Sequence, residues 1–239
     1  MNPHYINEHQ SLGRGIICAS DVERIANFEK KIYDRLILPP LLASEAGKIY
    51  EAAVGPGILQ CWLKSHGISE VEGCDISHKE IDLAKNFNAR IVKSDAIKDL
   101  EERFAADSFS LIVALDFYEH LERADFSKFL DIAFSRLQPG GTLILRGPNG
   151  DSPLVGTNFY NDVTHVWAYT TQSLRALLSI SGFSQISFVD DTKSSLHSGR
   201  WWKLPLMVFA QHLLTWAFYA ASRVQIKYWG ASIYVFARK

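Results

Sequence analysis

Three acidic residues, Asp75, Asp95 and Asp116, stand where short apolar runs of the chain end. A carboxylate accepts hydrogen bonds from ribose hydroxyls and attracts cations. If the apolar runs are parallel strands, their carboxyl ends meet at one edge of a sheet, where such folds bind ligands. A single acid at a strand end is usually only part of a solvated turn. Three of them at one edge predict a site.

A glycine turn precedes these acids in the stretch KIYEAAVGPG, Lys48 to Gly57. Its apolar residues predict a strand that is buried on both faces. Gly55 and Gly57 permit backbone conformations and close approaches that a Cβ would block. The helix predicted over Ile58–His66 would direct its first free N–H groups at a ligand above the turn. A strand–turn–helix unit also forms without a ligand, so only its combination with the acids predicts a cofactor site.

The spacing of these residues narrows the class of cofactor. Asp75 follows the glycines by about 20 residues, the spacing at which an acid binds ribose hydroxyls. A dinucleotide fingerprint has a third glycine where this chain has Gln60, and a phosphate loop ending in Lys and Ser or Thr is absent. Glu51, just before the turn, would repel phosphate and favour a cationic ligand. An adenosine-type cofactor without pyrophosphate fits these features.

The chain alternates predicted strands and helices, which is typical of a parallel sheet with helices on both faces. A capping box, Ser20 with Glu23, opens the first helix, and Pro39 and Pro40 end it. We expect an N-terminal arm and helix over residues 1–44, and one domain over 45–239 with an insertion at 192–230. Strands are predicted at 48–54, 71–75, 89–92, 109–116, 142–146, 185–190 and 231–238, and later helices at 58–66, 77–87, 97–104, 121–137 and 171–181.

Three segments together resemble the class I S-adenosylmethionine-dependent methyltransferases. EAAVGPG resembles that family's acidic-x-Gly-x-Gly-x-Gly motif, with Ala53 in place of the first glycine. DFYEHL, Asp116–Leu121, resembles the segment after its fourth strand, and LQPGGTLIL, Leu137–Leu145, its fifth strand. The resemblance covers about residues 45–190. It implies an α/β, Rossmann-like, seven-stranded and mostly parallel sheet with an antiparallel last strand. Here a helical insertion would separate the sixth and seventh strands.

The resemblance also implies S-adenosylmethionine as the cofactor and a set of residues that contact it. The set comprises Glu51, Ala53, Gly55 and Gly57 toward the methionine end, Asp75 at the ribose, Ile76, Asp95 and Ala96 around the adenine, and Asp116 and Phe117 beside the sulfonium.

Methyl transfer to a hydroxyl needs a base, and histidine is the side chain most readily tuned for that role. His165 is the first candidate, because it lies in a long loop, 146–170, that could cover an acceptor. Asp162 could pair with its imidazole, although Asp162 could also only cap a turn while His165 packs. His120, just beyond the fourth predicted strand, is the second candidate.

The segment around Asp162 and His165 further resembles methyltransferases that modify sugars and cell-surface glycans. The leading hypothesis is therefore O-methylation of a sugar or lipid-linked glycan. One alternative is methylation of a lipophilic small molecule such as a quinone precursor. Another is a catalytically silent cofactor-binding protein that docks a partner. The cysteines, Cys18, Cys61 and Cys74, have no metal-binding spacing, so no metal is expected.

The C-terminal region differs in charge from the rest of a chain whose net charge is −1. From Thr192 to Lys239 there are seven Lys or Arg and no acid, and Leu204–Ser222 has no charged residue. A single membrane crossing is excluded if the sixth and seventh strands share one sheet. We expect residues 200–229 to lie on the inner face of a membrane, or to pack on the domain itself or on a second subunit.

Nucleic acid is not expected as a partner, because the chain is not basic and carries no motif that reads bases. The scattered cysteines and the lack of an N-terminal signal pattern predict a reducing, cytoplasmic location.

Overall fold

One seven-stranded sheet forms the centre of the protein. The computed structural model describes residues 16–43, 47–190, 192 and 204–239, and within them the strand order is β3-β2-β1-β4-β5-β7-β6. β7 is antiparallel to β5 and β6, whereas the other pairs are parallel. The predicted mostly parallel, Rossmann-like sheet is confirmed. Its strands are β1 Ile49–Ala52, β2 Val71–Asp75, β3 Ile91–Lys93, β4 Phe109–Leu115, β5 Leu137–Pro148, β6 Ser184–Asp190 and β7 Ser232–Arg238.

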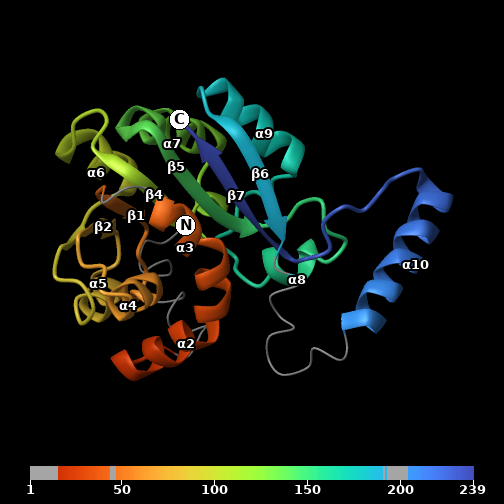
Figure 1. The fold of residues 1–239 in the computed structure, drawn as a ribbon, viewed down its shortest axis with the longest axis horizontal. Coiled ribbons are helices and arrows are strands. Elements are labelled where there is room, and N and C mark those ends of the chain that lie inside the picture. The colour runs from red at the N-terminus through yellow and green to blue at the C-terminus, as the bar shows by residue number, and fades with distance from the viewer. Residues whose placement is uncertain (1–15, 44–46, 191, 193–203) are drawn as a thin grey trace.

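Helices cover both faces of this sheet (Figure 1). On one face, α2, α3 and α4 contribute to a core that includes Tyr33, Trp62 and Tyr234. On the other face, α6, α7 and α9 enclose a larger core around Tyr50 and Phe126. The helices are α2 Ala19–Leu36, α3 Leu38–Ala43, α4 Ile58–Ser65, α5 His78–Ala84, α6 Ala96–Arg103, the 3-10 turn η1 Tyr118–His120, α7 Arg123–Arg136, α8 Val155–Phe159, α9 Thr171–Ile180 and α10 Leu204–Ser222.

The first helix begins earlier than the sequence predicts and ends for a different reason. Cys18 is the N-cap of α2, and the Asp21 carboxylate accepts hydrogen bonds from the backbone of Ile17 and Cys18. Asp21 thus takes the role that we expected for Glu23. α2 ends at Leu36, and the two prolines lie in the first turn of α3, where a missing N–H costs nothing.

The fifth strand is longer than the sequence predicts. We expected a turn at residues 138–141, but β5 runs continuously through them from Leu137. Its register against β4 shifts between Phe109 and Leu111, as at a β-bulge. β5 advances five residues there while β4 advances two, so three extra residues of β5 are accommodated without ending the strand. At its other end β5 extends past Arg146 to Pro148, and the following loop contains the short helix α8.

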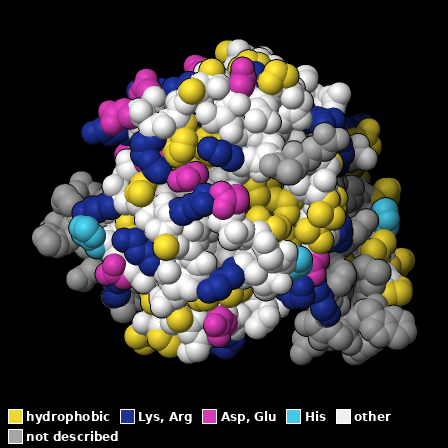
Figure 2. Space-filling model, turned by 60° about the vertical axis from the view of Figure 1, so that its left-hand side comes forward, with side chains coloured by type: hydrophobic (Ala, Val, Ile, Leu, Met, Phe, Trp, Pro, Cys, Tyr) yellow, Lys and Arg dark blue, Asp and Glu magenta, His cyan; other side chains and the backbone are white. Residues whose placement is uncertain are grey.

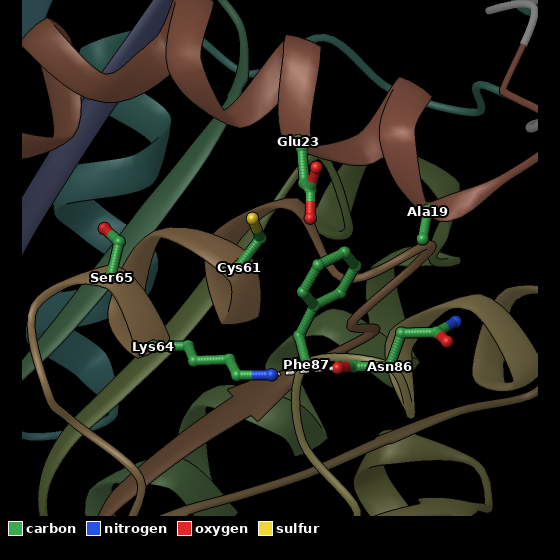
Figure 3. Close-up of a pocket in the computed structure, with 7 residues that line it drawn as sticks. All are labelled: Ala19, Glu23, Cys61, Lys64, Ser65, Asn86 and Phe87. Carbon is green, nitrogen blue, oxygen red and sulfur yellow. Dashed lines mark hydrogen bonds between the residues drawn. The ribbon is translucent and has the colours of Figure 1, made fainter.

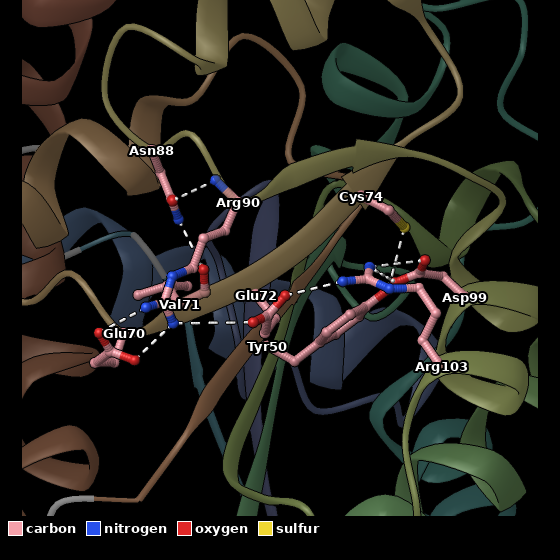
Figure 4. A network of polar contacts seen from close by, with 9 residues as sticks. All are labelled: Tyr50, Glu70, Val71, Glu72, Cys74, Asn88, Arg90, Asp99 and Arg103. Carbon is pink, nitrogen blue, oxygen red and sulfur yellow. Dashed lines mark hydrogen bonds and ion pairs between the residues drawn. The ribbon is translucent and has the colours of Figure 1, made fainter.

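A buried ion network ties α6 to β1 and β2 (Figure 4). Asp99 is 1% exposed and accepts hydrogen bonds from the Tyr50 hydroxyl at 2.9 Å and from Arg103 Nη1 at 2.9 Å. Arg103 also donates to Glu72 of β2 at 3.0 Å. Each carboxylate oxygen of Asp99 therefore accepts a hydrogen bond, and the Arg103 guanidinium balances its buried charge.

The helix of the insertion, α10, stands away from the sheet (Figure 1). None of the side chains described for it, from Pro205 to Ser222, is buried. Its Thr215 hydroxyl accepts a hydrogen bond from Trp229 Nε1 at 3.2 Å. Among the described residues, no helix is both long and apolar enough to cross a membrane. Arg200 and Lys203, which precede α10 in the sequence, lie outside the described residues.

The surface mixes charges of both signs. In Figure 2, Lys and Arg side chains alternate with Asp and Glu over the face shown. The whole chain has 25 basic and 26 acidic residues. Mixed charge of this kind produces no strong single-sign field on that face, and such a field is what nucleic-acid backbones require.

Candidate active site

The turn after β1 has the backbone geometry of a ligand cradle. Ala53, Gly55 and Gly57 all have positive φ, at 52°, 55° and 93°. A Cβ on Gly57 would lie 2.8 Å from Ala84 Cα, so this glycine lets α4 approach α5. A Cβ on Gly55 would meet no atom within 4 Å, so Gly55 borders open space. Gly57 therefore serves packing, whereas Gly55 leaves room above the turn.

Two buried carboxylates lie under this turn. Glu51 of β1 is 3% exposed, and its Oε2 accepts a hydrogen bond from Gln60 Nε2 at 2.6 Å. Burial, with a further contribution from Asp75, raises the pKa of Glu51 to about 8 against the favourable Gln60 contact. Burial also raises the pKa of Asp75, although the backbone N–H groups of Ser77 and Gly55 oppose it. A cationic group above the turn would favour ionisation of both acids.

Asp75 holds the two loops of the cradle together. Its Oδ2 accepts from the Gly55 backbone N–H, and its Oδ1 accepts from that of Ser77, both at 2.8 Å. The next residue, Ile76, is 51% exposed at the same edge of the sheet. An exposed aliphatic side chain beside a fixed carboxylate is the arrangement that a stacked adenine and its ribose require. Asp75 and Ile76 therefore lie together at the carboxyl edge of the sheet.

Asp95 and Ala96 start α6 at the same edge. The Asp95 side chain is the N-cap, accepting from Ile97 N at 3.0 Å and Lys98 N at 3.1 Å. Ala96 is buried. The carboxylate that we expected at the adenine edge therefore caps a helix. Its Oδ1 accepts both of these hydrogen bonds.

The acid after β4 is paired with a cation that the sequence analysis missed. Arg146 of β5 donates from Nε to Asp116 Oδ1 at 2.9 Å and from Nη2 to Oδ2. Burial would lower the pKa of Arg146, but Asp116 and nearby tyrosines raise it well above its usual value. Asp116 has a φ of 53°, and its backbone N–H donates to the Arg146 carbonyl at 2.8 Å. A charged residue at the end of an apolar strand was the only sequence signal for this pair.

Phe117, predicted beside the sulfonium, is 9% exposed and packs edge-on against Phe129 at 5.1 Å between ring centroids. Its ring belongs to the larger core. Phe117 therefore anchors the end of β4, and its neighbours Asp116 and Tyr118 share that fixed position.

The two candidate bases lie side by side beyond β4. The rings of His120 and His165 have centroids 4.7 Å apart. Nδ1 of His165 donates to the Phe159 carbonyl at 2.8 Å, and its Nε2 is 3.9 Å from Glu119 Oε1. Burial and the neighbouring His165 lower the pKa of His120, so its imidazole is neutral at physiological pH.

Asp162 supports His120 through Thr164, whereas the sequence left open whether Asp162 pairs with His165 or caps a turn. Its Oδ1 accepts from the Thr164 hydroxyl at 2.6 Å, and that hydroxyl contacts His120 Nδ1 at 2.9 Å. Burial raises the pKa of Asp162, but the two hydrogen bonds from Thr164 outweigh it, and the pKa lies below its usual value. The hydrogen bonds of the Asp162 side chain therefore lead through Thr164 to His120. Glu119 lies in the DFYEHL segment and Thr164 lies between Asp162 and His165, but the sequence assigned neither of them a role.

A separate hollow of about 430 Å³ lies between α2, α4 and the end of α5 (Figure 3). Lys64 of α4 donates to the Asn86 carbonyl at 3.1 Å across it. Burial, followed by the nearby Glu23, raises the pKa of Cys61, so this thiol stays protonated. The hollow is lined by Ala19, Glu23, Cys61, Lys64, Ser65, Asn86 and Phe87. This lining offers no activated thiol nucleophile.

The fold and the cradle define a nucleotide-type cofactor enzyme of the Rossmann-like α/β class, and the comparisons specify which one. The Methyltransferase domain family matches residues 25–187. The chain belongs to this family and is an S-adenosylmethionine-dependent methyltransferase. The predicted family is thereby confirmed, whereas nothing in the match concerns glycans. No curated protein matches the chain.

Solved structures support the same fold. A SAM-dependent methyltransferase from Archaeoglobus fulgidus is 19% identical, with a TM-score of 0.69 and full coverage of both chains. A possible histamine N-methyltransferase from Thermotoga maritima is 17% identical, with a TM-score of 0.61, covering 99% of this chain and 97% of its own. A methyltransferase from Mesorhizobium loti is 18% identical, with a TM-score of 0.55, and the match covers 82% and 93%. At these identities the likeness shows the fold alone.

Proposed function

We propose that the protein transfers a methyl group to a hydroxyl oxygen, and that a sugar or lipid-linked glycan is the acceptor. The observation that supports this is the position of His165 Nε2. Nδ1 of this imidazole is held by the Phe159 carbonyl, so Nε2 carries a lone pair. It lies beside Glu119 and His120, immediately beyond the end of β4. The acceptor hydroxyl would approach there.

The cradle residues fit S-adenosylmethionine. Glu51 would face the methionine ammonium, Asp75 the ribose hydroxyls, and Ile76 the adenine ring. The space at Gly55 and the raised pKa values of the two acids support this assignment, because a cation is the ligand that such acids favour. The bound cofactor supplies a methyl group already activated by its positive sulfur.

The residues beyond β4 would act on the acceptor. His165 Nε2 would take up the hydroxyl proton or the charge that develops as the proton leaves. Asp162 and Thr164 would hold His120 in position beside it. Arg146 would fix Asp116, so that the backbone between β4 and η1 keeps one geometry during the reaction.

Replacing His165 tests the assignment. His165→Ala should lower kcat by 10²- to 10⁴-fold, the usual contribution of a positioned acid or base. Its affinity for S-adenosylhomocysteine should be unchanged, because His165 lies outside the cradle. His212→Ala, an exposed imidazole on α10, is the matched control with a water-soluble acceptor. Full turnover by His165→Ala would exclude this residue from the reaction.

The acceptor class needs its own assay. Radiolabelled S-adenosylmethionine should transfer label to the glycan fraction of an extract, and less to its lipid and small-molecule fractions. Label only in the small-molecule fraction would refute the glycan acceptor. Binding of S-adenosylhomocysteine without transfer to any fraction would favour the silent docking protein.

A lipophilic small molecule is the second candidate, and one observation favours it. α10 exposes Leu206, Phe209 and Trp216 at 65–69% each. An apolar helix of this kind would bring the enzyme to a membrane that holds such an acceptor. Flotation with anionic vesicles should recover the protein with the lipid, and Trp216→Ser should weaken the recovery. A dimer in solution without flotation would instead assign α10 to a second subunit.

A further inference from the structure

We propose that Glu119, His120 and His165 bind one divalent transition-metal ion. One ligand atom of each residue lies within 4.8 Å of the other two. Two imidazoles and one carboxylate are a ligand set that suits Mn²⁺, Fe²⁺ or Zn²⁺. His120 and His165 come from segments on either side of α7 and β5, so no local spacing in the sequence indicates the site.

The two imidazoles are held as metal-binding histidines usually are. A carbonyl oxygen can only accept, so Nδ1 of His165 carries the proton in its contact with Phe159. The Thr164 hydroxyl gives its own hydrogen to Asp162 and can therefore accept from Nδ1 of His120. Both rings then keep the Nε2 lone pair for a ligand. Metal-binding histidines characteristically donate their other N–H to a carbonyl, a carboxylate or a group that one holds.

The backbone joins the two segments that carry the ligands. The Glu119 carbonyl accepts hydrogen bonds from Val166 N at 2.7 Å and Trp167 N at 3.4 Å. The side chains of Glu119 and His165 are 2% and 10% exposed. The 3.9 Å between His165 Nε2 and Glu119 Oε1 is too long for a hydrogen bond. A cation bound to both needs its donors roughly 3.0–3.5 Å apart, so a small side-chain rotation would complete the site.

Three protein ligands leave coordination positions for a water or an acceptor oxygen. A hydroxyl bound there loses its proton more readily, and that proton would leave to solvent water. With the metal bound, His165 Nε2 would act as a ligand and the metal would replace it as the group that activates the acceptor. This role rests on the proposed hydroxyl methylation. Metal binding itself does not, because it follows from the three side chains alone.

Mn²⁺ alone is the first probe. The untagged full chain, freed of metal with a chelator, is titrated while the signal of free Mn²⁺ is followed by electron paramagnetic resonance. We expect one bound Mn²⁺ per chain, and electron spin-echo spectra of the bound ion should show coupling to two imidazole nitrogens. Absence of saturable binding, or of nitrogen coupling, would overturn the site. These wild-type measurements do not depend on whether any variant folds.

Variants then assign the ligands. Glu119→Gln and His165→Ala should weaken Mn²⁺ binding by about 100-fold or more, and Thr164→Val by about 10- to 100-fold. His212→Ala should bind as the wild type does. Unchanged affinity for S-adenosylhomocysteine shows that each variant is folded. If Glu119→Gln and His165→Ala both bind Mn²⁺ normally, the proposal is wrong.

Two measurements on the wild-type protein distinguish failure of the metal-site proposal from failure of the proposed function. Methyl transfer should fall at least tenfold in chelator and recover with Mn²⁺. Transfer that is indifferent to chelator would overturn the metal's role in the reaction. Failure to bind S-adenosylhomocysteine, with one Mn²⁺ still bound, would refute the proposed function and support the metal site.

Discussion

Two buried acids of this sheet have nearly the same exposure and very different surroundings. Asp99 is 1% exposed and forms an ion pair with Arg103 at 2.9 Å (Figure 4). Glu51 is 3% exposed, and its hydrogen bond comes from the neutral amide of Gln60. Among the described residues, no ion pair involves Glu51. A buried carboxylate that is paired with a cationic side chain is part of the fold's own ion pairs. A buried carboxylate without such a partner is ionised more readily when a positively charged ligand binds beside it.

We propose that this difference separates structural acids from ligand-binding acids without reference to any motif. Asp116 belongs with Asp99, because Arg146 pairs with it. Asp75 belongs with Glu51, because backbone N–H groups hold it and burial raises its pKa. Four acids at or near one end of the sheet thus fall into two pairs. The predictions below test whether changes at the two kinds of acid have separable effects.

The largest effect is expected at Asp75. Asp75→Ala removes the acceptor that joins the loops of Gly55 and Ser77, along with the proposed ribose contact. Calorimetry with S-adenosylhomocysteine should show at least a 100-fold loss of affinity, or about 2.8 kcal/mol. Asp82→Ala, an exposed acid on α5, is the matched control. Equal affinities for Asp75→Ala and wild type would refute the cofactor assignment, and Asp75→Asn checks that the loss is not a folding defect.

Arg103→Ala should produce the opposite pattern. It leaves Asp99 buried without its cation, and we expect the free energy of unfolding to fall by about 2 kcal/mol. The value is below the usual range for a buried pair because the Arg103 side chain is 35% exposed. Arg90→Ala, which breaks an exposed pair with Glu70, should cost less than about 1 kcal/mol. Urea unfolding measures the stability of both variants. A changed cofactor affinity in folded Arg103→Ala would contradict the distinction between structural and ligand-binding acids.

Glu51→Gln should remove a pH dependence. The folded pKa of Glu51 is about 8, above the ordinary value of 4.5, so the folded chain holds a proton that the unfolded chain has lost. Between these values the stability of the ligand-free wild type should therefore fall as pH rises, by up to about 1.4 kcal/mol per pH unit from this group.

Urea unfolding from pH 5 to 9 checks this, and Glu51→Gln should lack that part of the slope. Cofactor binding offers a second readout. At pH 7 a cationic ligand should release a proton from wild-type Glu51 and none from the variant. Identical slopes and proton release in the two proteins would show that Glu51 is already ionised.

The alternation of strands and helices, the glycine turn and the acids at the ends of β2, β3 and β4 were predictable, because each depends on a local pattern. Apolar runs, Gly55 and Gly57 act within a few residues of themselves. The pairing of Asp116 with Arg146, and of Asp162 with Thr164 and His120, was not predictable in this way. Arg146 lies 30 residues beyond Asp116, and Thr164 lies 44 beyond His120.

The contacts of Asp162 and Thr164 with His120 depend on how the loop after β5 folds back onto η1. The hydrogen bond from Val166 N to the Glu119 carbonyl fixes that return, and no residue type marks it in the sequence. The length of the loop nevertheless indicated that it carries function, and it is the loop that brings His165 to the end of β4. Predicting its exact contacts needs the tertiary structure.

The smallest expected effect concerns Ala53, which stands where the resembled motif has glycine. Its φ of 52° costs an L-residue about 1 kcal/mol. Glycine removes that strain but has greater freedom in the unfolded chain, so Ala53→Gly should gain only about 0.5 kcal/mol. In thermal unfolding this corresponds to about 1–2 °C. Ala52→Gly, one residue earlier in the fully buried strand, should instead destabilise the protein, because it loses packing without relieving strain. Ala53→Gly could instead destabilise the protein as much as Ala52→Gly does. The packing of the Ala53 methyl group would then outweigh its backbone strain, and the turn would owe its stability to side-chain contacts, as the Asp99 site does.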